Sequence, residues 1–153
     1  MKNLIVVFLV GFLVSCGTAN KAEAQSEIKV AEAFHQGWTA GVRGGGGGIN
    51  FHLTLKSELP KGIELKRLIF KGFEVPFIQQ DTLFYQAAII TGVNQERFEG
   101  DEKNTTSSSK NSTKLKDNEA ILIYTKNGKE YQQKITNVIE KPALEYPSAK
   151  PKF

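Results

Sequence analysis

The sequence predicts an all-β domain after an N-terminal signal segment. The expected fold is an antiparallel β-sandwich or small barrel of about seven to eight strands. Three observations support this class. Apolar and polar residues alternate in several short stretches, most regularly over residues 49–55, and a period of two is typical of strands. Turn-forming sequences separate these stretches at short intervals, and no segment carries the apolar stripe of an amphipathic helix.

Length and composition favour one domain. The chain has 153 residues, with 20 basic and 16 acidic side chains. The basic residues are scattered among acidic ones rather than gathered in a stripe, which predicts no nucleic-acid partner. Because the chain contains one cysteine, no intrachain disulfide can form, and the cysteine needs another explanation.

Residues 1–15 have the layout of a signal peptide. Lys2 precedes an apolar run from Leu4 to Val14, which is too short to span a bilayer core of about 30 Å. The run ends in Leu13-Val14-Ser15-Cys16, which resembles the bacterial lipobox. The resemblance implies cleavage between Ser15 and Cys16, diacylation of the Cys16 thiol and acylation of its new amino group.

Acylated Cys16 is therefore the predicted contact with a membrane. Each buried CH₂ contributes about 0.8 kcal/mol and one acyl chain binds only reversibly, so several chains on one residue give a stable anchor. Residues 16–27 are small and polar, as expected of a flexible tether. An aspartate directly after the cysteine would resemble an inner-membrane retention signal, but Gly17 stands at this position. The tether also lacks an acidic cluster similar to the surface-export signal of Bacteroidetes lipoproteins, so we expect an outer-membrane location facing the periplasm.

Residues 28–146 are the predicted β-domain, and its first hairpin spans a run of glycines. Apolar residues fall mostly on even positions from Ile28 to Val42 and on odd positions from Ile49 to Leu55, with Gly44–Gly48 between them. An antiparallel pair explains this change of parity if both sets face the core. The predicted partners are Trp38 and Leu53, Ala40 and Phe51, and Val42 and Ile49.

Further strands follow along the chain. A turn at residues 60–62 precedes a strand over 63–70 with a bulge, a short edge strand over 73–77 and a strand over 83–91 covered on both faces. Residues 94–118 are polar and low in complexity, which predicts a mobile loop. Asn127-Gly128 predicts a hairpin turn between residues 119–125 and 130–140. The proline-containing stretch from Lys141 is expected to be irregular, with residues 147–153 as a tail.

The C-terminal segment also carries a resemblance. Residues 118–147, NEAILIYTKNGKEYQQKITNVIEKPALEYP, are similar to the C-terminal hairpin of small uncharacterised Bacteroidetes envelope lipoproteins. This resemblance implies an origin and an envelope location, and it implies no activity.

The glycine run does not match a nucleotide-binding loop. Ile49 stands where the third glycine of a GxGxxG motif belongs, and Gly47 stands where a P-loop needs lysine. A strand, not a helix, is predicted to follow, so we expect no nucleotide partner. An alternative remains that the bare backbone lets an envelope protein or a glycan approach closely, with Arg43 as its polar contact.

No catalytic or metal-binding constellation is evident. His35 and His52 are predicted to lie on the outer face, too far apart for a shared metal, unless another register places them opposite each other. No GxSxG motif occurs, and no cofactor is expected. Asp81-Thr82-Leu83 resembles a short O-glycosylation motif of Bacteroidetes secreted proteins, although Thr82 could also start a strand.

These expectations lead to two hypotheses about function. The first is a lipid-anchored envelope protein that acts as a non-catalytic binding or structural module. The alternative is an envelope hydrolase whose site lies under the 94–118 loop. A histidine–acid pair or two acids converging in a pocket near that loop would favour the hydrolase.

Overall fold

The computed structural model describes residues 28–94 and 109–148. These residues form ten strands in two five-stranded sheets, with no helix. The predicted all-β class is confirmed, and the sandwich is the alternative that the structure adopts. The strand count exceeds the predicted seven to eight mainly because of the two-residue strands β5 and β7 and the C-terminal strand β10.

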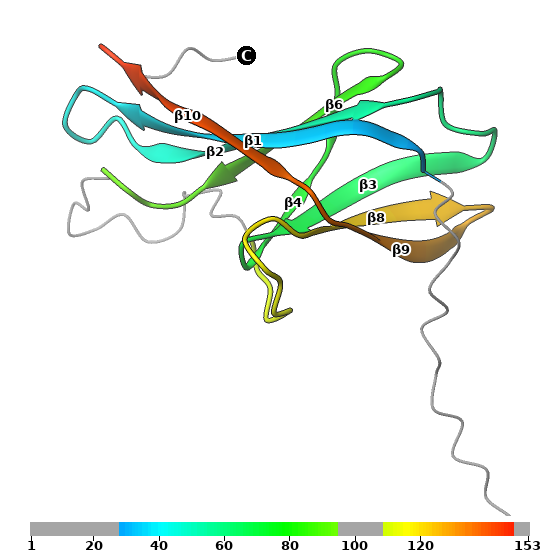
Figure 1. Cartoon of the computed structure of the whole chain (residues 1–153). Coiled ribbons are helices and arrows are strands. Elements are labelled where there is room, and N and C mark those ends of the chain that lie inside the picture. Colours follow the sequence, from blue (N-terminus) through cyan, green and yellow to red (C-terminus); the bar gives the residue numbers. More distant parts are fainter. Residues whose placement is uncertain (1–27, 95–108, 149–153) are drawn as a thin grey trace, which may run out of the picture.

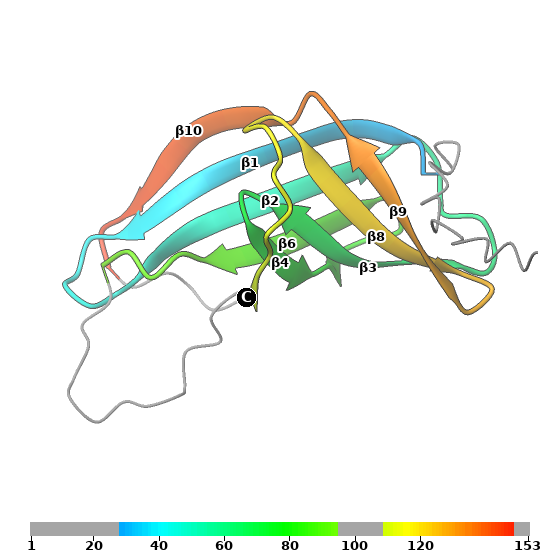
Figure 2. The same ribbon diagram turned by 90° about the horizontal axis from the view of Figure 1, so that it is seen from below.

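The two sheets lie one over the other (Figure 1). Sheet A has the order β10-β1-β2-β6-β5. Its strands are Ile139–Tyr146, Val30–Ala40, Gly47–Leu55, Phe84–Ile90 and Ile78–Gln79. Sheet B has the order β7-β4-β3-β8-β9. Its strands are Ser109–Lys110, Phe73–Pro76, Ile63–Phe70, Ala120–Lys126 and Lys129–Ile135. Seen from below, strands β8 and β9 cross β1 and β2 at an angle (Figure 2).

Alternate residues of both sheets fill the space between them. Removing these apolar side chains from water is the main stabilising contribution to such a fold. The rings of Phe51 and Phe70, one from each sheet, meet edge to face at 5.1 Å. Other members of this core are Leu53, Leu55, Ala87 and Ile89 of sheet A, and Leu68, Leu122 and Tyr124 of sheet B.

The predicted hairpin across the glycine run is present, because β1 and β2 pair in antiparallel fashion. Its predicted register is wrong. Trp38 lies opposite Gly48 rather than Leu53, and His35 lies opposite Phe51. Gly47 and Gly48 belong to β2 rather than to the turn, so the chain reverses nearer to Arg43 than a turn centred on the glycines would require.

In this register, β1 buries one face in its first half and the opposite face in its second half. Ala33 and His35 point into the core between the sheets, which corrects the prediction that the even positions face it throughout. Trp38 is 6% exposed, as expected of a buried residue. It pairs with Gly48 and therefore lies on the other face of sheet A from Phe51. Val42, predicted to be buried opposite Ile49, is exposed on the turn.

Gly48 is required where the indole of Trp38 crosses β2. A Cβ at position 48 would lie 2.2 Å from the carbonyl oxygen of Ile89 and 2.9 Å from Nε1 of Trp38. Contacts this short are not tolerated in packed proteins. Gly46 has a positive φ of 82°, a backbone conformation that residues with a side chain rarely adopt. A Cβ there would lie 3.8 Å from the Trp38 indole. The glycines thus serve both the turn and the packing of Trp38.

Residues 139–146 form the strand β10, although the stretch from Lys141 was predicted to be irregular. β10 runs parallel to β1, so sheet A is mixed rather than purely antiparallel. The chain leaves β9 at the edge of sheet B and crosses to the free edge of β1 in sheet A. Pro142 is accommodated because β10 is an edge strand, which has a ladder on one side only.

Other predicted features are confirmed. Pairing between β3 and β8 shifts between Leu65 and Arg67, where a bulge was expected. Asn127 and Gly128 have φ values of 50° and 78° and connect β8 to β9 as a two-residue turn. β6 differs from its prediction: its burial alternates along the strand, and Phe84 is exposed, so only one of its faces is fully covered.

Part of the predicted mobile loop 94–118 is built into sheet B. Residues 109–110 form β7 beside β4. The backbone amide of Asn111 donates to the carbonyl oxygen of Gly72 at 2.8 Å, and its side-chain amide donates to the Glu74 carboxylate at 2.9 Å. Residues 109–111 of the segment thus make contacts with sheet B, while residues 95–108 lie outside the described part of the chain.

We predict that Gly48→Ala destabilises the protein by about 1–3 kcal/mol, the usual result of overpacking. The added methyl group must displace the Trp38 indole or the β6 backbone. Chemical denaturation followed by circular dichroism measures the change. Gly37→Ala in β1 is the control, since its Cβ would meet only Ala143 at 3.8 Å. Equal stability of the two variants would contradict the register described above.

Candidate functional site

The sequence-predicted site residues do not converge. Ser15 and Cys16 lie outside the described residues. Arg43 is exposed at the tip of the β1–β2 hairpin. Thr82 is exposed in the turn between β5 and β6, where its backbone amide donates to the Asp81 carboxylate at 2.6 Å.

The hairpin that carries Arg43 is fastened to the end of β6 by Asn94. The side-chain amide of Asn94 donates to the carbonyl oxygens of Ala40 and Val42 at 2.8 and 2.9 Å. The carbonyl oxygen of Asn94 accepts from the amide of Gly46 at 2.9 Å. Asn94 adopts φ 53°, a conformation that asparagine tolerates better than most residues. The turn is thus held in one shape.

The two histidines lie on opposite faces of sheet A, which corrects the prediction that both point outward. His35 is 3% exposed and its ring contacts Phe70 of sheet B at 5.0 Å. His52 pairs with Phe34 across the ladder and stacks on its ring at 4.5 Å, on the outer face. The sheet between them prevents them from acting as a pair on one substrate or metal.

Burial disfavours the protonated form of His35. Burial lowers its pKa below the ordinary 6.5, and the positive charge of Lys71 lowers it further. The carboxylates of Glu140 and Asp117 act in the opposite direction, with Glu140 Oε2 at 3.9 Å from His35 Nε2. Since desolvation prevails, protonating His35 costs stability.

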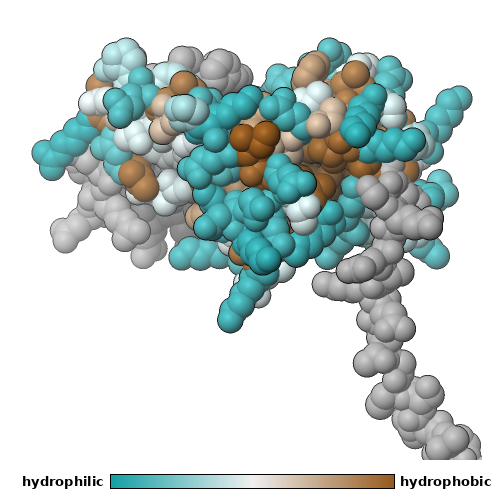
Figure 3. All heavy atoms as spheres, viewed as in Figure 1, coloured by the Kyte–Doolittle hydropathy of each residue, from teal (hydrophilic) through white to brown (hydrophobic). Residues whose placement is uncertain are grey.

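A row of side chains crosses the outer face of sheet A. The paired residues are Ile78, Gln86, His52, Phe34 and Ile139, one from each strand. Lys141 Nζ lies 3.3 Å from the centre of the Phe34 ring, so His52 and Lys141 cover opposite faces of that ring. Phe34 therefore offers no open ring face on which a sugar could stack. On the face of the molecule that Figure 3 shows, apolar residues are interspersed with hydrophilic ones.

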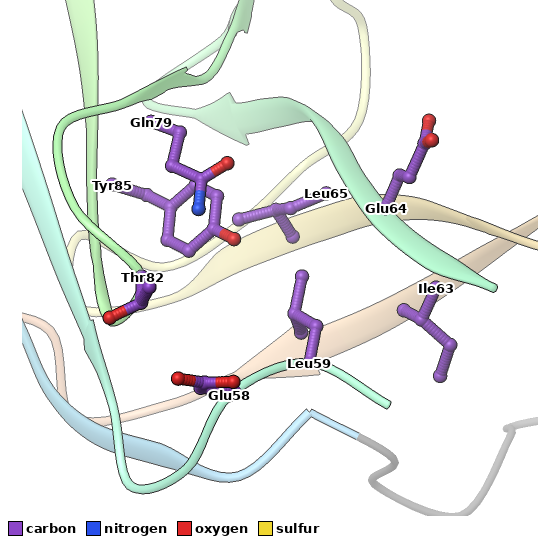
Figure 4. A pocket seen from close by; sticks show the side chains of 8 residues that line it. All are labelled: Glu58, Leu59, Ile63, Glu64, Leu65, Gln79, Thr82 and Tyr85. Carbon is purple, nitrogen blue, oxygen red and sulfur yellow. The ribbon is translucent and has the colours of Figure 1, made fainter. Parts of the chain in front are cut away.

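A pocket of about 390 Å³ opens between the two sheets at one end of the sandwich. Its walls come from the β2–β3 connection, the start of β3, and the β5–β6 turn (Figure 4). The backbone amide of Lys56 donates to the carbonyl oxygen of Lys29 at 2.8 Å, and that of Leu55 donates to Leu83 at 2.9 Å. The pocket thus lies at the end of the domain where β1 begins.

Apolar and polar side chains both line the pocket. Leu59, Ile63 and Leu65 supply the apolar ones, and Glu58, Gln79, Thr82 and Tyr85 the polar ones. The Tyr85 hydroxyl points towards Leu65 and Leu59, while Gln79 and Glu58 lie at opposite ends of the pocket (Figure 4). Glu64 also borders the pocket, but its carboxylate points away from it and pairs with Lys66. Small-molecule sites usually combine apolar surface with a few polar groups, and this pocket has both, although four of its eight lining residues are exposed.

Two further findings concern the described residues only. In residues 28–94 and 109–148, no three histidine, cysteine, aspartate or glutamate side chains come close enough together to hold a metal ion. The same residues contain no helix that could span a membrane.

Comparison of the chain with protein-family models, with curated proteins and with solved structures gives no match.

The pocket was not predicted from the sequence, because its residues come from separate segments that only the fold brings together. One signal in the sequence pointed towards it. Tyr85 shares the buried phase of β6 with the apolar residues Ala87 and Ile89, and a buried phenol needs a polar neighbour for its hydroxyl group.

We predict that the free energy of unfolding falls as pH is lowered from 7.5 to 5. His35 has a lowered pKa in the folded state, so the unfolded chain binds protons more readily below about pH 6.5. The contribution of neutral His35 to the free energy of unfolding is complete above that pH, and it declines as the pH falls through the folded-state pKa. Urea denaturation at several pH values measures the slope. His35→Gln should flatten it, whereas His52→Gln should leave it. An unchanged slope in His35→Gln would refute this assignment.

Proposed function

We propose that the protein is a lipid-anchored protein of the bacterial envelope that acts as a non-catalytic binding module. The chain would be held in the membrane by acyl groups on Cys16 and would present the β-sandwich beside it. The lipobox-like residues Leu13 to Cys16 support the anchor. The pocket between the sheets supports binding, since apolar and polar side chains both line it.

The observation that carries this proposal is the attachment of the first residue of the domain. Ile28 is 1% exposed. Its backbone amide donates to the side-chain oxygen of Gln133 at 3.0 Å, and its carbonyl oxygen accepts from the Gln133 side-chain nitrogen at 2.8 Å. A tether that starts at Cys16 therefore meets a fixed point on the folded domain.

The length of the tether supports a location close to the membrane. Residues 17–27 separate Cys16 from Ile28. A chain of this length spans at most about 40 Å when extended and about 20 Å on average when flexible. Since the pocket lies at the end where β1 begins, it would open on the side of the domain nearest to the bilayer. We infer a periplasm-facing outer-membrane location from Gly17 and the tether composition alone.

Non-catalytic action is the simpler proposal. His35 and His52 are separated by sheet A, and no contact of residues 109–118 favours the alternative of a hydrolase site under the 94–118 loop. The side chain of Asn111 in that segment binds the Glu74 carboxylate, as expected of a structural contact. A module that binds an envelope ligand or partner does not require either histidine to be reactive.

We predict that cells fed an alkyne fatty acid incorporate the label into the wild-type protein, and that Cys16→Ala loses both the label and the membrane fraction. The thiol of Cys16 is the acceptor in this mechanism, so its removal leaves nothing to acylate. Ser15→Ala is the control, because it keeps a small residue before the cysteine and should retain the label. Labelling of Cys16→Ala, or an unlabelled wild-type protein, would refute the anchor.

A further inference from the structure

Strand β9 leaves one edge of sheet B open. It lies beside β8 at the end of the sheet (Figure 2) and, within residues 28–94 and 109–148, pairs with no other strand. The other three sheet edges are short or interrupted, since β5 and β7 have two residues each and β10 contains Pro142. Very short strands and proline are common means of keeping an edge from pairing with another chain. β9 has seven residues and no proline, so it is the edge best able to accept a further strand.

Three residues of β9 direct their backbone groups towards this open edge. The turn between β8 and β9 has two residues, so Lys126 and Lys129 form the first hydrogen-bonded pair of the hairpin. Hydrogen-bonded and non-hydrogen-bonded pairs alternate along an antiparallel ladder. Glu130, Gln132 and Lys134 therefore occupy the non-hydrogen-bonded positions towards β8. Their N–H and C=O groups point away from β8, where a further strand can pair with them.

The side chains of these three residues are arranged symmetrically by charge. Glu130 and Lys134 stand at equal distances along the strand on either side of Gln132. All three lie on the outer face of sheet B, because they alternate with Gln133, which is buried. If two copies of β9 pair in antiparallel fashion about Gln132, Glu130 of each copy lies opposite Lys134 of the other. Opposite charges in directly facing positions stabilise a strand pair, whereas like charges destabilise it.

We propose that the partner of β9 is the β9 strand of a second copy of this chain, paired antiparallel about Gln132. The two copies of sheet B then form one continuous sheet. In this register every outward-pointing backbone group of the three residues has a partner, because each facing pair exchanges two hydrogen bonds. A shift of the register carries Glu130 or Lys134 past the end of the other strand or opposite a like charge.

Ion pairs on the outer face of sheet B continue across this joint. Arg67 Nη2 lies 2.7 Å from Glu130 Oε2, and Lys134 Nζ lies 2.9 Å from Glu119 Oε2. Where Glu130 of one copy faces Lys134 of the other, these two ion pairs join into one row of alternating charge. Exposed ion pairs contribute little singly and more in a network. The charges therefore select the partner and the register, while the backbone hydrogen bonds supply affinity.

The dimer places the attachment points of both tethers on one side of the joined sheet. Directly facing residues of an antiparallel pair present their side chains on the same face, so the Gln133 side chains of both copies point to the same face. Each of them holds the backbone of Ile28. The chains that lead to Ile28 thus approach the two domains from one side, as two anchors in one membrane require. The association goes beyond the proposed binding function and does not depend on acylation of Cys16.

The experiment exchanges the facing charges in the full chain. The intact protein is purified in a nonionic detergent that is matched in density to the solvent, and sedimentation equilibrium measures its mass over a range of concentrations. We expect the wild type to dimerise reversibly. Glu130→Lys brings like charges together at Lys134, and Lys134→Glu does the same at Glu130. Each variant alone should dimerise about tenfold more weakly, since two facing pairs change from attraction to repulsion.

An equimolar mixture of the two variants should regain the association of the wild type. In the mixed dimer every lysine of the joint again faces a glutamate, whereas loss of the contacts with Arg67 or Glu119 within each chain is not reversed by mixing. Glu145→Lys is the matched control, because it changes an exposed charge on the other long edge strand, β10. This variant should dimerise like the wild type.

Gln132→Pro tests the backbone hydrogen bonds separately from the charges. It removes the outward N–H at the centre of the joint and leaves the ladder with β8 complete, so dimerisation should be lost. Circular dichroism and a melting curve for each variant show whether it is folded. A wild-type protein that is monomeric at every concentration, a folded Gln132→Pro that dimerises normally, or a mixture that does not recover would overturn the proposal.

Discussion

The packing of one indole on one glycine determines how sheet A is built. Trp38 needs a flat surface on β2, and Gly48 is the position that offers it, since a Cβ there would meet both the indole and the β6 backbone. This contact sets the pairing of β1 with β2. A slip of one residue would exchange the two faces of a strand, so the same contact places His35 in the core and Phe34 outside.

The fold class and most turns followed from the sequence because they depend on local patterns. The regular alternation of residues 49–55 and the Asn127-Gly128 turn each carry their own signal. The register of β1 and the strand β10 did not follow. The buried residues of β1 stand on odd positions in its first half, at Ala33 and His35, and on even positions in its second half, at Trp38 and Ala40, and a single parity cannot reveal this. β10 is mostly exposed and contains Pro142, so nothing local marks it as a strand.

The candidate site also divides into features that a local sequence pattern marks and features that only the fold assembles. The lipobox-like segment is contiguous, and its chemistry is therefore visible in the sequence. The pocket combines Glu58 from one connection with Gln79 and Tyr85 from another part of the chain, and only the stacking of sheet A on sheet B brings them together. The isolated polar group on the buried phase of β6 was the trace that this arrangement left in the sequence.

The position of Ile28 also determines how the domain would respond to mechanical load. β1 lies between β2 and β10 and is hydrogen-bonded to both, and Gln133 of sheet B holds Ile28 at its start. A pull on the preceding chain along the strand direction would load two ladders in shear rather than open one ladder bond by bond. The same force applied to the exposed edge strand β10 would act on a single ladder, so we expect the C-terminal strand to detach at lower tension.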